Sequence, residues 1–443
     1  MFPKILIANR GEIAVRVIRA CKEMGVSTVA VFSEADRDAL HVSLADESYC
    51  IGPAQVSGSY LNMKAILSAA RLSGAQAIHP GYGLLSENPE FAAMCAENGV
   101  KFIGPSAEVI RHMGDKDEAR RTMRRAGVPV VPGCDLVETV EAARAEAEKI
   151  GFPLLIKARA GGGGRGIRRV DSMEELEKAY QTASGEAKSA FGDGSVYMEK
   201  FLTDVKHVEV QLLCDGQGNA VALGERDCSM QRRNQKLIEE SPSPAVDEEL
   251  RARMMDAAVR AAKAVNYEGA GTVEFLLTRD KQFYFMEMNT RLQVEHPVTE
   301  MVTGIDLVKW QIRVAAGMEL PFRQEEISVR GHAIECRINA ENPAENFRPS
   351  CGRVTLLHVP GGPWVRFDTA LYQDYFIPPY YDSMIGKLIV HAQTRAEAIR
   401  KMQAALCEMV VEGVEHNGYL QSDLIGEKKF EDGSYTTGFL NER

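Results

Sequence analysis

The sequence of 443 residues lacks any apolar run near the ~20 residues that a membrane-spanning helix needs. It also lacks Cys-x-x-Cys pairs, and its nine cysteines are an odd number, which favours reduced thiols over a disulfide framework or a zinc site. Lys and Arg total 52 against 62 Asp and Glu, so the net charge of −10 argues against broad binding of nucleic acid or anionic membranes. We therefore expect a cytoplasmic protein with no nucleic-acid or membrane partner.

Two common phosphate-binding motifs are also missing. The dinucleotide fingerprint G-x-G-x-x-G is absent, because the first turn reads Asn9-Arg10-Gly11-Glu12 and Gly81-Tyr82-Gly83 lacks the third glycine. The P-loop pattern G-x-x-x-x-G-K-[ST] does not occur either. The sequence thus disfavours an NAD enzyme and the common P-loop NTPase folds.

The first hundred residues alternate apolar strand patterns with amphipathic helix patterns. We expect strands at 4–8, 28–32, 75–79 and 100–103, and helices at 12–24 and 61–73. This alternation predicts an α/β fold with a doubly wound parallel sheet. The start is strand-like and carries no signal-peptide or transit pattern, so we expect the mature protein to begin there.

The later residues read as two further regions. A Pro/Gly-rich stretch at 128–133 precedes a compact unit with helices at 140–150 and 173–185, and a hairpin at 272–289 follows. From about residue 331 the chain is rich in strands and turns, which indicates α+β character in its later part. The predicted domains are 1–113, 114–330 with a mobile lid subdomain at about 133–202, and 331–443.

A glycine-rich loop lies inside the predicted lid. Four consecutive glycines, Gly161 to Gly164, are flanked by Arg159 and Arg165, and Lys157 precedes them. Backbone without Cβ atoms can approach phosphate oxygens and point N–H groups at them, while the cations neutralise charge. The pattern predicts a loop that covers a triphosphate; the alternative is a surface turn.

Polar residues alternate at the end of the predicted hairpin. In extended backbone one face would carry Glu287, Asn289, Arg291, Gln293 and Glu295. If Asp280-Lys281 is a two-residue turn, Glu274 lies opposite Glu287, whereas a three-residue turn shifts this register by one. Paired carboxylates need a cation, so the pattern predicts Mg²⁺ carrying nucleotide phosphates. The alternative is a solvated edge strand.

A third cluster is rich in charges of both signs. It spans residues 225–236 and continues to Glu239 and Glu240. Its Arg and Lys suit an anion, but a charge run is more often a solvated face. We expect Cys228 to be a packed thiol rather than a nucleophile, and His79 and His207 taken singly to be structural histidines.

Eight segments taken together resemble one known family. They are IANRGEIAVRVIRACKEMG (7–25), HPGYGLLSEN (79–88), MGDK (113–116), GGGGRG (161–166), ERDCSMQRR (225–233), EMNTRLQVEHPVTE (287–300), ECRINAE (335–341) and PPYYDSMIGKL (378–388). Their residues and order resemble the ATP-grasp superfamily and, within it, the biotin carboxylases over essentially the whole chain. The resemblance implies an ATP-grasp fold.

The resemblance also implies site residues. It places ATP near Lys116, Lys157, Gly161, Gly162, Gly163, Gly164, Gly166, Glu199, Lys200, Leu202, His207, Gln231 and Asn234. Mg²⁺ or Mn²⁺ would be held by Glu274, Glu287 and Asn289. Bicarbonate and biotin would be bound by Lys236, Arg291, Gln293, Val294, Glu295, Arg337 and Tyr82. Glu295 would be the general base, Arg337 would stabilise the biotin enolate, and Lys236 and Arg291 would stabilise anionic oxygens.

The implied reaction has two stages. ATP phosphorylates bicarbonate to carboxyphosphate, and the resulting CO₂ or carboxyphosphate carboxylates N1 of biotin. The implied setting is acetyl-CoA carboxylase in fatty acid synthesis, with a homodimer, a biotin carboxyl carrier protein and carboxyltransferase subunits as partners. The alternatives are a subunit of another acyl-CoA or pyruvate carboxylase, a different ATP-grasp carboxylating ligase, or a nucleotide-binding module without turnover.

Two departures and one absence qualify this resemblance. The family usually has His where this chain has Asn234 and a small residue where it has Arg159, so ATP affinity or activity is expected to differ. Biotin domains carry an Ala/Val-Met-Lys-Met/Leu hairpin, and the nearest match here is Asn62-Met63-Lys64-Ala65. Because the chain also ends soon after the resemblance, we expect it to act on a carrier in trans and not to be biotinylated itself.

Overall fold

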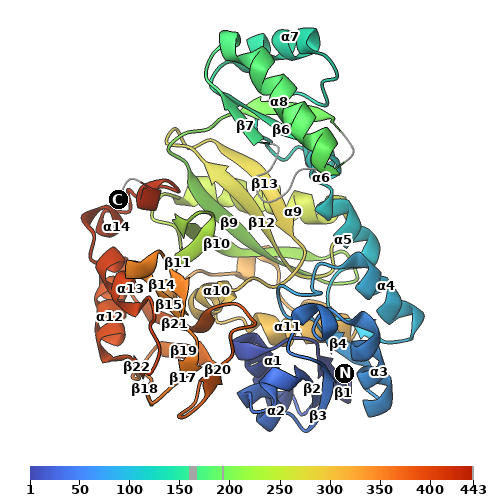
Figure 1. Ribbon diagram of the computed structural model, residues 1–443, viewed down its shortest axis with the longest axis vertical. Helices are drawn as coiled ribbons and strands as arrows, with labels where there is room; N and C mark the ends of the chain where they lie inside the picture. Colours follow the sequence, from blue (N-terminus) through green and yellow to red (C-terminus); the bar gives the residue numbers. More distant parts are fainter. Residues whose placement is uncertain (159–166, 192–193, 442–443) are drawn as a thin grey trace.

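A five-stranded parallel sheet forms the N-terminal region of the computed structural model, which describes residues 1–158, 167–191 and 194–441 (Figure 1). Its strands, in spatial order, are β3 (Glu47–Gly52), β2 (Ser27–Ser33), β1 (Lys4–Ile7), β4 (Ala77–His79) and β5 (Lys101–Phe102). Its helices are α1 (Gly11–Glu23), α2 (Leu40–Leu44), α3 (Met63–Ser73), α4 (Pro89–Glu97) and α5 (Ala107–Gly114). All neighbouring strands run parallel, which confirms the doubly wound prediction.

The strand order of this sheet reverses between β1 and β4. Loops that leave the carboxyl ends of two such strands meet at the reversal, where open α/β sheets bind ligands. Asn9, just after β1, donates its side-chain amide to the carbonyl oxygens of Pro80 at 2.7 Å and Tyr82 at 2.8 Å. These bonds fix the loop that carries Tyr82 beside the start of α1.

An eight-stranded antiparallel sheet forms the centre of the molecule. In spatial order it contains β13 (Phe283–Asn289), β12 (Gly269–Leu277), β9 (Lys206–Cys214), β10 (Ala220–Arg232), β11 (Gln235–Ser241), β14 (His332–Asn339), β21 (Met384–Ala392) and β19 (Val365–Thr369). The predicted domain border at residue 331 comes just before β14. This strand is hydrogen-bonded to β11 of the middle region in the same sheet. The middle and C-terminal regions share this sheet.

Helices cover both faces of the central sheet. On one face α9 (Glu248–Ala264) packs on Val208, Val210 and Leu212 of β9. On the other, α10 (His296–Thr303) lies over β10, β14 and β21, and α11 (Leu307–Ala315) packs on β12 and α1. Because strand side chains alternate, Glu209 and Gln211 point away from α9. The polar residues of the middle strands therefore gather on the face that α10 covers.

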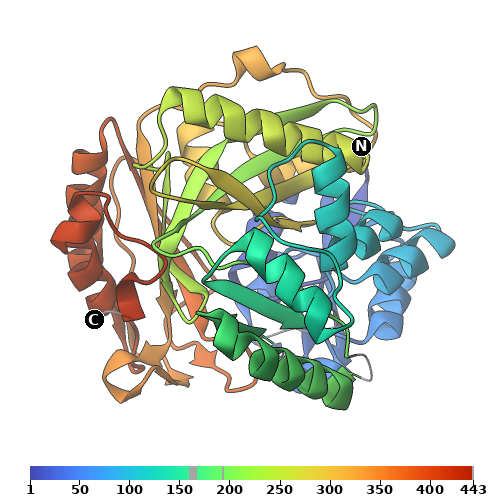
Figure 2. The ribbon, with the colours of Figure 1, turned by 90° about the horizontal axis from the view of Figure 1, so that it is seen from above.

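A small separate layer stands at one end of this sheet (Figure 1; Figure 2 shows it from above). It is the sheet β7-β6-β8, made of β6 (Leu154–Ala158), β7 (Ile167–Val170) and β8 (Val196–Lys200), with α7 (Val140–Ile150) and α8 (Met173–Phe191). It has its own apolar core, which includes Ala143, Ile156 and Met198. The helix α6 (Lys116–Arg125) precedes it. This layer corresponds to the predicted lid.

Short strands and three helices complete the C-terminal region. The strands are β15 (Glu341–Asn342), β16 (Arg348–Pro349), β17 (Gly352–Arg353), β18 (Leu356–His358), β20 (Phe376–Ile377) and β22 (Val410–Glu412). The helices are α12 (Arg395–Glu408), α13 (Gly418–Ile425) and α14 (Lys428–Glu431). The described residues include all nine cysteines, and none of these forms a disulfide. No helix in the described part of the chain has the length and apolar character to span a membrane.

A buried carboxylate links the C-terminal region to the central sheet, and its removal should be measurable. Glu240 accepts hydrogen bonds from His332 at 2.6 Å, Arg395 at 2.7 Å and Tyr435 at 2.5 Å. Burial alone would raise the pKa of Glu240, but His332 and Arg395 lower it to about 2. Glu240→Gln is expected to cost about 3–5 kcal/mol of unfolding free energy at pH 7.

The pH dependence gives the check on that prediction. A carboxyl whose pKa is lowered by folding stabilises the protein above its ordinary pKa of 4.5 and loses this contribution as the pH falls toward 2. Denaturant unfolding of wild type and Glu240→Gln should therefore give values that converge below pH 4.5. The exposed Glu412→Gln is the control. A difference that stays constant from pH 7 to pH 3.5 would contradict the prediction.

Candidate active site

The hairpin β12–β13 places two carboxylates side by side. Glu274 lies directly opposite Glu287, as predicted, but the two-residue turn was wrong. The turn has three residues, because Thr278 donates its N–H to the carbonyl of Gln282 at 2.9 Å and the backbone of Lys281 has φ +61°. Phe275 consequently pairs with Phe285, and the extra residue Met286 bulges before Glu287. The bulge restores the register that the longer turn shifts.

The predicted continuation of this strand to residue 295 was also wrong. β13 ends at Asn289, and the chain turns at Val294 and Glu295 into α10, where Pro297 occupies the first turn. The side chains nevertheless converge. Gln293 donates its amide to Glu274 at 2.7 Å, and Glu295 reaches the same group of charges. A turn rather than strand alternation brings them together.

Lys236 is the centre of this group of charges. Its ammonium lies 2.7 Å from Glu209, 2.9 Å from Glu274 and 2.6 Å from Glu295. Burial alone would lower the pKa of Lys236, but Cys228 and these three carboxylates raise it well above the usual value. Burial likewise would raise the pKa of Glu295, yet Lys236, Arg337 and Arg226 hold it well below the usual range. Both groups are ionised near neutral pH.

The charged cluster at 225–240 is largely buried, so the solvated-face alternative was wrong there. Arg226 is completely buried and donates to Glu209 and Gln211 at 2.6 Å and to Gln293 at 2.8 Å. Only the hairpin tip is exposed, where Arg233 and Asn234 both have positive φ and form the two-residue turn that β-hairpins favour. Cys228 is buried and burial raises its pKa, so it is a packed thiol as expected.

Two arginines frame the cluster. Arg337 donates to Glu239 at 2.6 Å and to Glu295 at 2.9 Å, which ties the neighbouring strands β11 and β14 to the turn before α10. Arg291 donates to Glu87 at 2.8 Å and to Asn289 at 3.1 Å. Glu87 was missed in the sequence, although it lies in the HPGYGLLSEN segment. It orients Arg291 from the N-terminal region.

The floor of the site contains three residues that sequence reasoning either missed or placed only by resemblance. Tyr82 donates a hydrogen bond to Glu12, and the Lys387 ammonium lies 3.2 Å from Glu12 and donates to the Val294 carbonyl at 2.8 Å. Lys387 is fully buried in β21. A lysine inside the apolar run 384–392 was the signal that could have identified it. These contacts connect the reversal point of the parallel sheet to the turn that carries Glu295.

The paired carboxylates suit a hard divalent cation. Burial would raise the pKa of Glu274, yet Lys236 and His207 hold it well below the usual range. Burial and the charge of Glu274 raise the pKa of Glu287, so Glu287 is the carboxylate that is short of positive charge. The nearest lysine to Glu287, Lys116, is exposed and lies 3.8 Å away. Asn289 is buried beside them, and its amide oxygen Oδ1 accepts a hydrogen bond from Arg291 at 3.1 Å. Two carboxylates and an amide oxygen form a donor set that fits Mg²⁺ or Mn²⁺.

The remaining residues expected at a nucleotide lie in the lid, on β9 and in the hairpin β10–β11. In the lid, Lys157 of β6 pairs with Glu199 of β8, while Lys200 donates to the Phe152 carbonyl at 2.7 Å and Leu202 follows the strand. His207 lies 3.1 Å from Glu274. Gln231 is buried and Asn234 is exposed. Arg159, Gly161 to Gly164, Arg165 and Gly166 lie outside the described residues.

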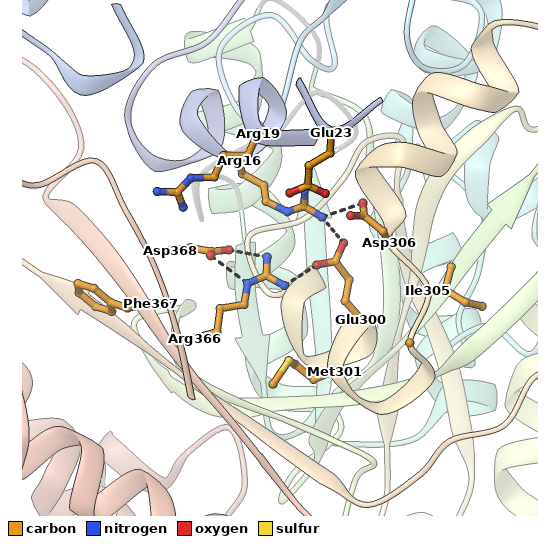
Figure 3. A pocket seen from close by; sticks show the side chains of 11 residues that line it. Arg16, Arg19, Glu23, Glu300, Met301, Ile305, Asp306, Arg366, Phe367 and Asp368 are labelled. Carbon is orange, nitrogen blue, oxygen red and sulfur yellow. Dashed lines mark hydrogen bonds and ion pairs between the residues drawn. The ribbon is translucent and has the colours of Figure 1, made fainter. Parts of the chain in front are cut away.

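A cavity of about 420 Å³ lies elsewhere, between α1, the α10–α11 connection and β19 (Figure 3). Most of its charged side chains pair with one another, as the dashed lines in Figure 3 show. Arg16 donates to Glu300 and Asp306 at 2.8 Å, and Arg366 donates to Glu300 at 2.7 Å and Asp368 at 2.6 Å. No residue expected at the active site lines it. We therefore assign the candidate active site to the cluster around Lys236.

Comparison with known families gives an independent assignment. The model of the biotin carboxylase N-terminal domain matches residues 1–110, the carbamoyl-phosphate synthase L chain ATP binding domain matches 115–323, and the biotin carboxylase C-terminal domain matches 335–442. With the fold described above, these matches define a protein of the ATP-grasp class. More particularly, the chain belongs to the biotin carboxylase family.

Relatives and solved structures agree with this assignment. Biotin carboxylase 1 of Bacillus subtilis is 58% identical over 442 residues, which are 99% of this chain and 98% of the relative. The crystal structure of a biotin carboxylase complex with beta-gamma-ATP from Campylobacter jejuni is 52% identical, with TM-score 0.94 and coverage of 100% and 99%. The biotin carboxylase domain dimer of 2-oxoglutarate carboxylase from Hydrogenobacter thermophilus, bound to MgADP, ADP and bicarbonate, is 50% identical, with TM-score 0.92 and coverage of 100% and 98%. The prediction of an ATP-dependent carboxylase enzyme is confirmed.

Proposed function

We propose that the chain carboxylates biotin on a separate carrier protein, using ATP and bicarbonate, with Glu295 as the base. The observation that carries this proposal is the position of Glu295, whose two oxygens contact Lys236 at 2.6 Å and Arg337 at 2.9 Å. One carboxylate is thus held between two cations that can each receive an anionic oxygen. Such an arrangement suits the deprotonation of bicarbonate beside a site for the biotin ring.

In the ligand-free arrangement the Glu295 carboxylate is a weak base. Lys236 and Arg337 hold its pKa well below the usual range, whereas an efficient base has a pKa near the working pH. Bicarbonate bound to Lys236 and Arg291 would share their positive charge and loosen the hold on Glu295. The proton of bicarbonate then passes to Glu295 while a bicarbonate oxygen attacks the terminal phosphorus of ATP. The products are carboxyphosphate and ADP. The basicity of Glu295 therefore increases only when bicarbonate is bound.

Biotin would bind on the other side of Glu295. Arg337 directs its guanidinium to that carboxylate, and Tyr82 belongs to the same floor of the site. Carboxyphosphate would break down to CO₂ and phosphate, and the phosphate would take the proton from N1 of biotin. As N1 attacks CO₂, negative charge grows on the ureido oxygen of the ring. The Arg337 guanidinium is placed to stabilise that charge. Gln293 and Val294 would complete the bicarbonate side.

The nucleotide would lie between the lid and the hairpin β12–β13. Lys116, Lys157 and His207 supply positive or donor groups to its phosphates, and the segment 199–202 would receive the adenine. Glu274, Glu287 and Asn289 would hold Mg²⁺ or Mn²⁺, which neutralises phosphate charge when bound. Gln231 and Asn234 belong to the proposed nucleotide side, and Asn234, unlike histidine, cannot become cationic there.

The larger assembly and the acceptor are also part of the proposal. We assign the chain to acetyl-CoA carboxylase in the cytoplasm, working as a homodimer with a biotin carboxyl carrier protein and carboxyltransferase subunits. The free cysteines suit a reducing compartment, and one solved relative is described as a domain dimer. That relative belongs to a 2-oxoglutarate carboxylase, so a different acceptor is the alternative. The proposed domains are 1–113, 114–330 and 331–443.

Release of phosphate from ATP tests the function directly. Hydrolysis should depend on bicarbonate and should increase when free biotin is added. Purified carrier protein with labelled bicarbonate should then become carboxylated. ATP cleavage that needs ammonia or another amine instead of biotin would identify a different ligase of the same class and would refute the proposal.

The lid should close on the nucleotide. Its separate apolar core, and the two bridges from Gly133 to Glu199 and from Val137 to Val196 that hold its first residues to β8, allow it to move as one body. We expect a non-hydrolysable ATP analogue to slow hydrogen exchange at least about tenfold in the loop 161–166 and in β6. Mass spectrometry measures this, with α12 as the internal control. Unchanged exchange in both segments would contradict closure.

A further inference from the structure

A pair of buried carboxyl groups lies behind Arg337. Glu239 of β11 and Glu335 of β14 are directly opposite one another in the antiparallel ladder, so their side chains share one face of the sheet. Both residues have no exposed surface. Arg337 follows Glu335 by two residues on the same face and donates to Glu239 Oε1 at 2.6 Å. The pair is therefore in contact with the arginine that bonds to Glu295.

Three oxygens of this pair have no hydrogen-bond partner among the described residues. They are Oε2 of Glu239 and both oxygens of Glu335. An ionised carboxylate that is buried without partners carries a large desolvation cost, and two of them side by side add repulsion. One proton shared by the pair removes both problems, because it gives one oxygen a hydrogen to donate and removes one charge.

The cations around Glu335 are committed elsewhere. Lys387, on the neighbouring strand β21, contacts Glu12 and the Val294 carbonyl, and Arg337 contacts Glu239 and Glu295. The titratable and charged groups that face Glu335 from the elements packed around it are Glu239, Arg337, Lys387, Glu295 and Tyr82. Burial, together with Glu239 and Glu295, raises the pKa of Glu335 well above the usual value, and that of Glu239 rises to about 7. Glu335 is the more strongly protonated member of the pair.

We propose that Glu335 is a positioning residue, which remains a neutral acid and donates its O–H to the free oxygen of Glu239 so that Glu239 holds Arg337 against Glu295. The pair then carries one negative charge, located on Glu239, and Arg337 balances it. If Glu335 lost its proton, a second negative charge would compete for Arg337 and draw it from Glu295. The kinetic part of this inference rests on the proposed function, in which Arg337 faces biotin.

Kinetics of two variants test the positioning role. Glu335→Leu removes the donor and is expected to lower kcat/KM for biotin about tenfold, because a displaced arginine loses alignment with the substrate. The KM for ATP should not change. Glu335→Gln retains an N–H donor of the same shape and should rescue most of the loss, while Glu412→Gln on exposed β22 serves as the control. A loss as large in Glu335→Gln as in Glu335→Leu would refute the proposal, since an essential negative charge would then be indicated.

The pH profile and infrared spectroscopy separate this inference from a purely structural role. Loss of the Glu335 proton at high pH should reduce biotin-dependent turnover in the wild type, and Glu335→Gln, which cannot ionise, should shift that fall to higher pH. The infrared carbonyl band of a buried protonated carboxyl should be present at pH 7 in wild type and absent in Glu335→Gln. This band is measured without substrate, so it decides the protonation even if the proposed function fails. Identical spectra of the two proteins would overturn the inference.

Discussion

Replacing Glu295 by glutamine is expected to lower biotin-dependent kcat at least about a hundredfold, the scale of losing a general base. Glutamine keeps the shape and one acceptor oxygen but cannot take the proton from bicarbonate. It also removes the negative charge that Lys236 and Arg337 share at 2.6 and 2.9 Å. Nucleotide binding should change little, because Lys236 lies between Glu295 and the hairpin that carries Glu274 and Glu287. Steady-state kinetics measures the first effect and calorimetry with ATP the second.

The matched control for this experiment is Glu268→Gln. Glu268 is also a glutamate paired with a lysine, Lys101, at 2.7 Å, but the pair is half-exposed and far from the cluster around Lys236. Surface ion pairs contribute about 0–1 kcal/mol, so this variant should fold and turn over as the wild type does. Turnover of Glu295→Gln within about threefold of wild type would exclude Glu295 as the base.

The hairpin β12–β13 illustrates how far residue spacing can predict a site. The opposition of Glu274 and Glu287 was predicted correctly, but the turn assumed for it was not the one that forms. Residue spacing does not encode the third turn residue or the bulge at Met286. Each shifts the strand pairing by one residue, and the two shifts compensate each other. The convergence of Gln293 and Glu295 on Glu274 depends in turn on where β13 ends and α10 begins. Those limits are set by tertiary packing.

Buried charge was the feature that sequence patterns predicted least well. A run such as 225–240 usually indicates a solvated face, yet β10 and β11 lie inside an eight-stranded sheet and their charges pair with groups distant in sequence. Arg226 donates hydrogen bonds to Gln293 and Thr299, and Lys387 forms an ion pair with Glu12, which lies near the other end of the sequence. A local window cannot contain both partners of such a pair. The resemblance placed Lys236 and Arg337 in the site. It did not include Glu209 and Glu239, the buried carboxylates that contact them.

The parallel sheet and the helices were easier to predict. Strand and helix periods repeat within short windows, and the helix 140–150 has the limits that were expected. The helix 173–185 is longer in the structure, where α8 continues to Phe191. Its continuation includes Ala187, which is completely buried in the folded unit. Local periodicity thus specifies elements, while their ends and partners depend on the assembled sheet.

Replacing Arg226 by methionine is expected to cost about 3–5 kcal/mol of unfolding free energy, as much as the loss of the Glu240 carboxylate. Arg226 is completely buried, and its guanidinium donates to Glu209, Gln211, Thr272, Thr299 and Gln293. Methionine fills similar volume but leaves the buried Glu209 without the guanidinium, with Lys236 at 2.7 Å and His207 at 3.7 Å. Denaturant unfolding at pH 7 measures the loss.

The same substitution distinguishes a structural arginine from one that serves the reaction alone. Arg226→Lys restores a positive charge beside Glu209 but cannot form the fork of hydrogen bonds to both Gln211 and Gln293, so it should recover only part of the lost stability. Because Lys236 also bonds to Glu209, freeing that carboxylate in Arg226→Met should draw Lys236 from Glu295 and lower bicarbonate-dependent ATP cleavage, and Arg226→Lys should show a smaller loss. If Arg226→Met unfolds with wild-type free energy while its activity falls, the buried arginine does not stabilise the sheet, and its hydrogen bonds serve to hold Glu209 and Gln293 for catalysis.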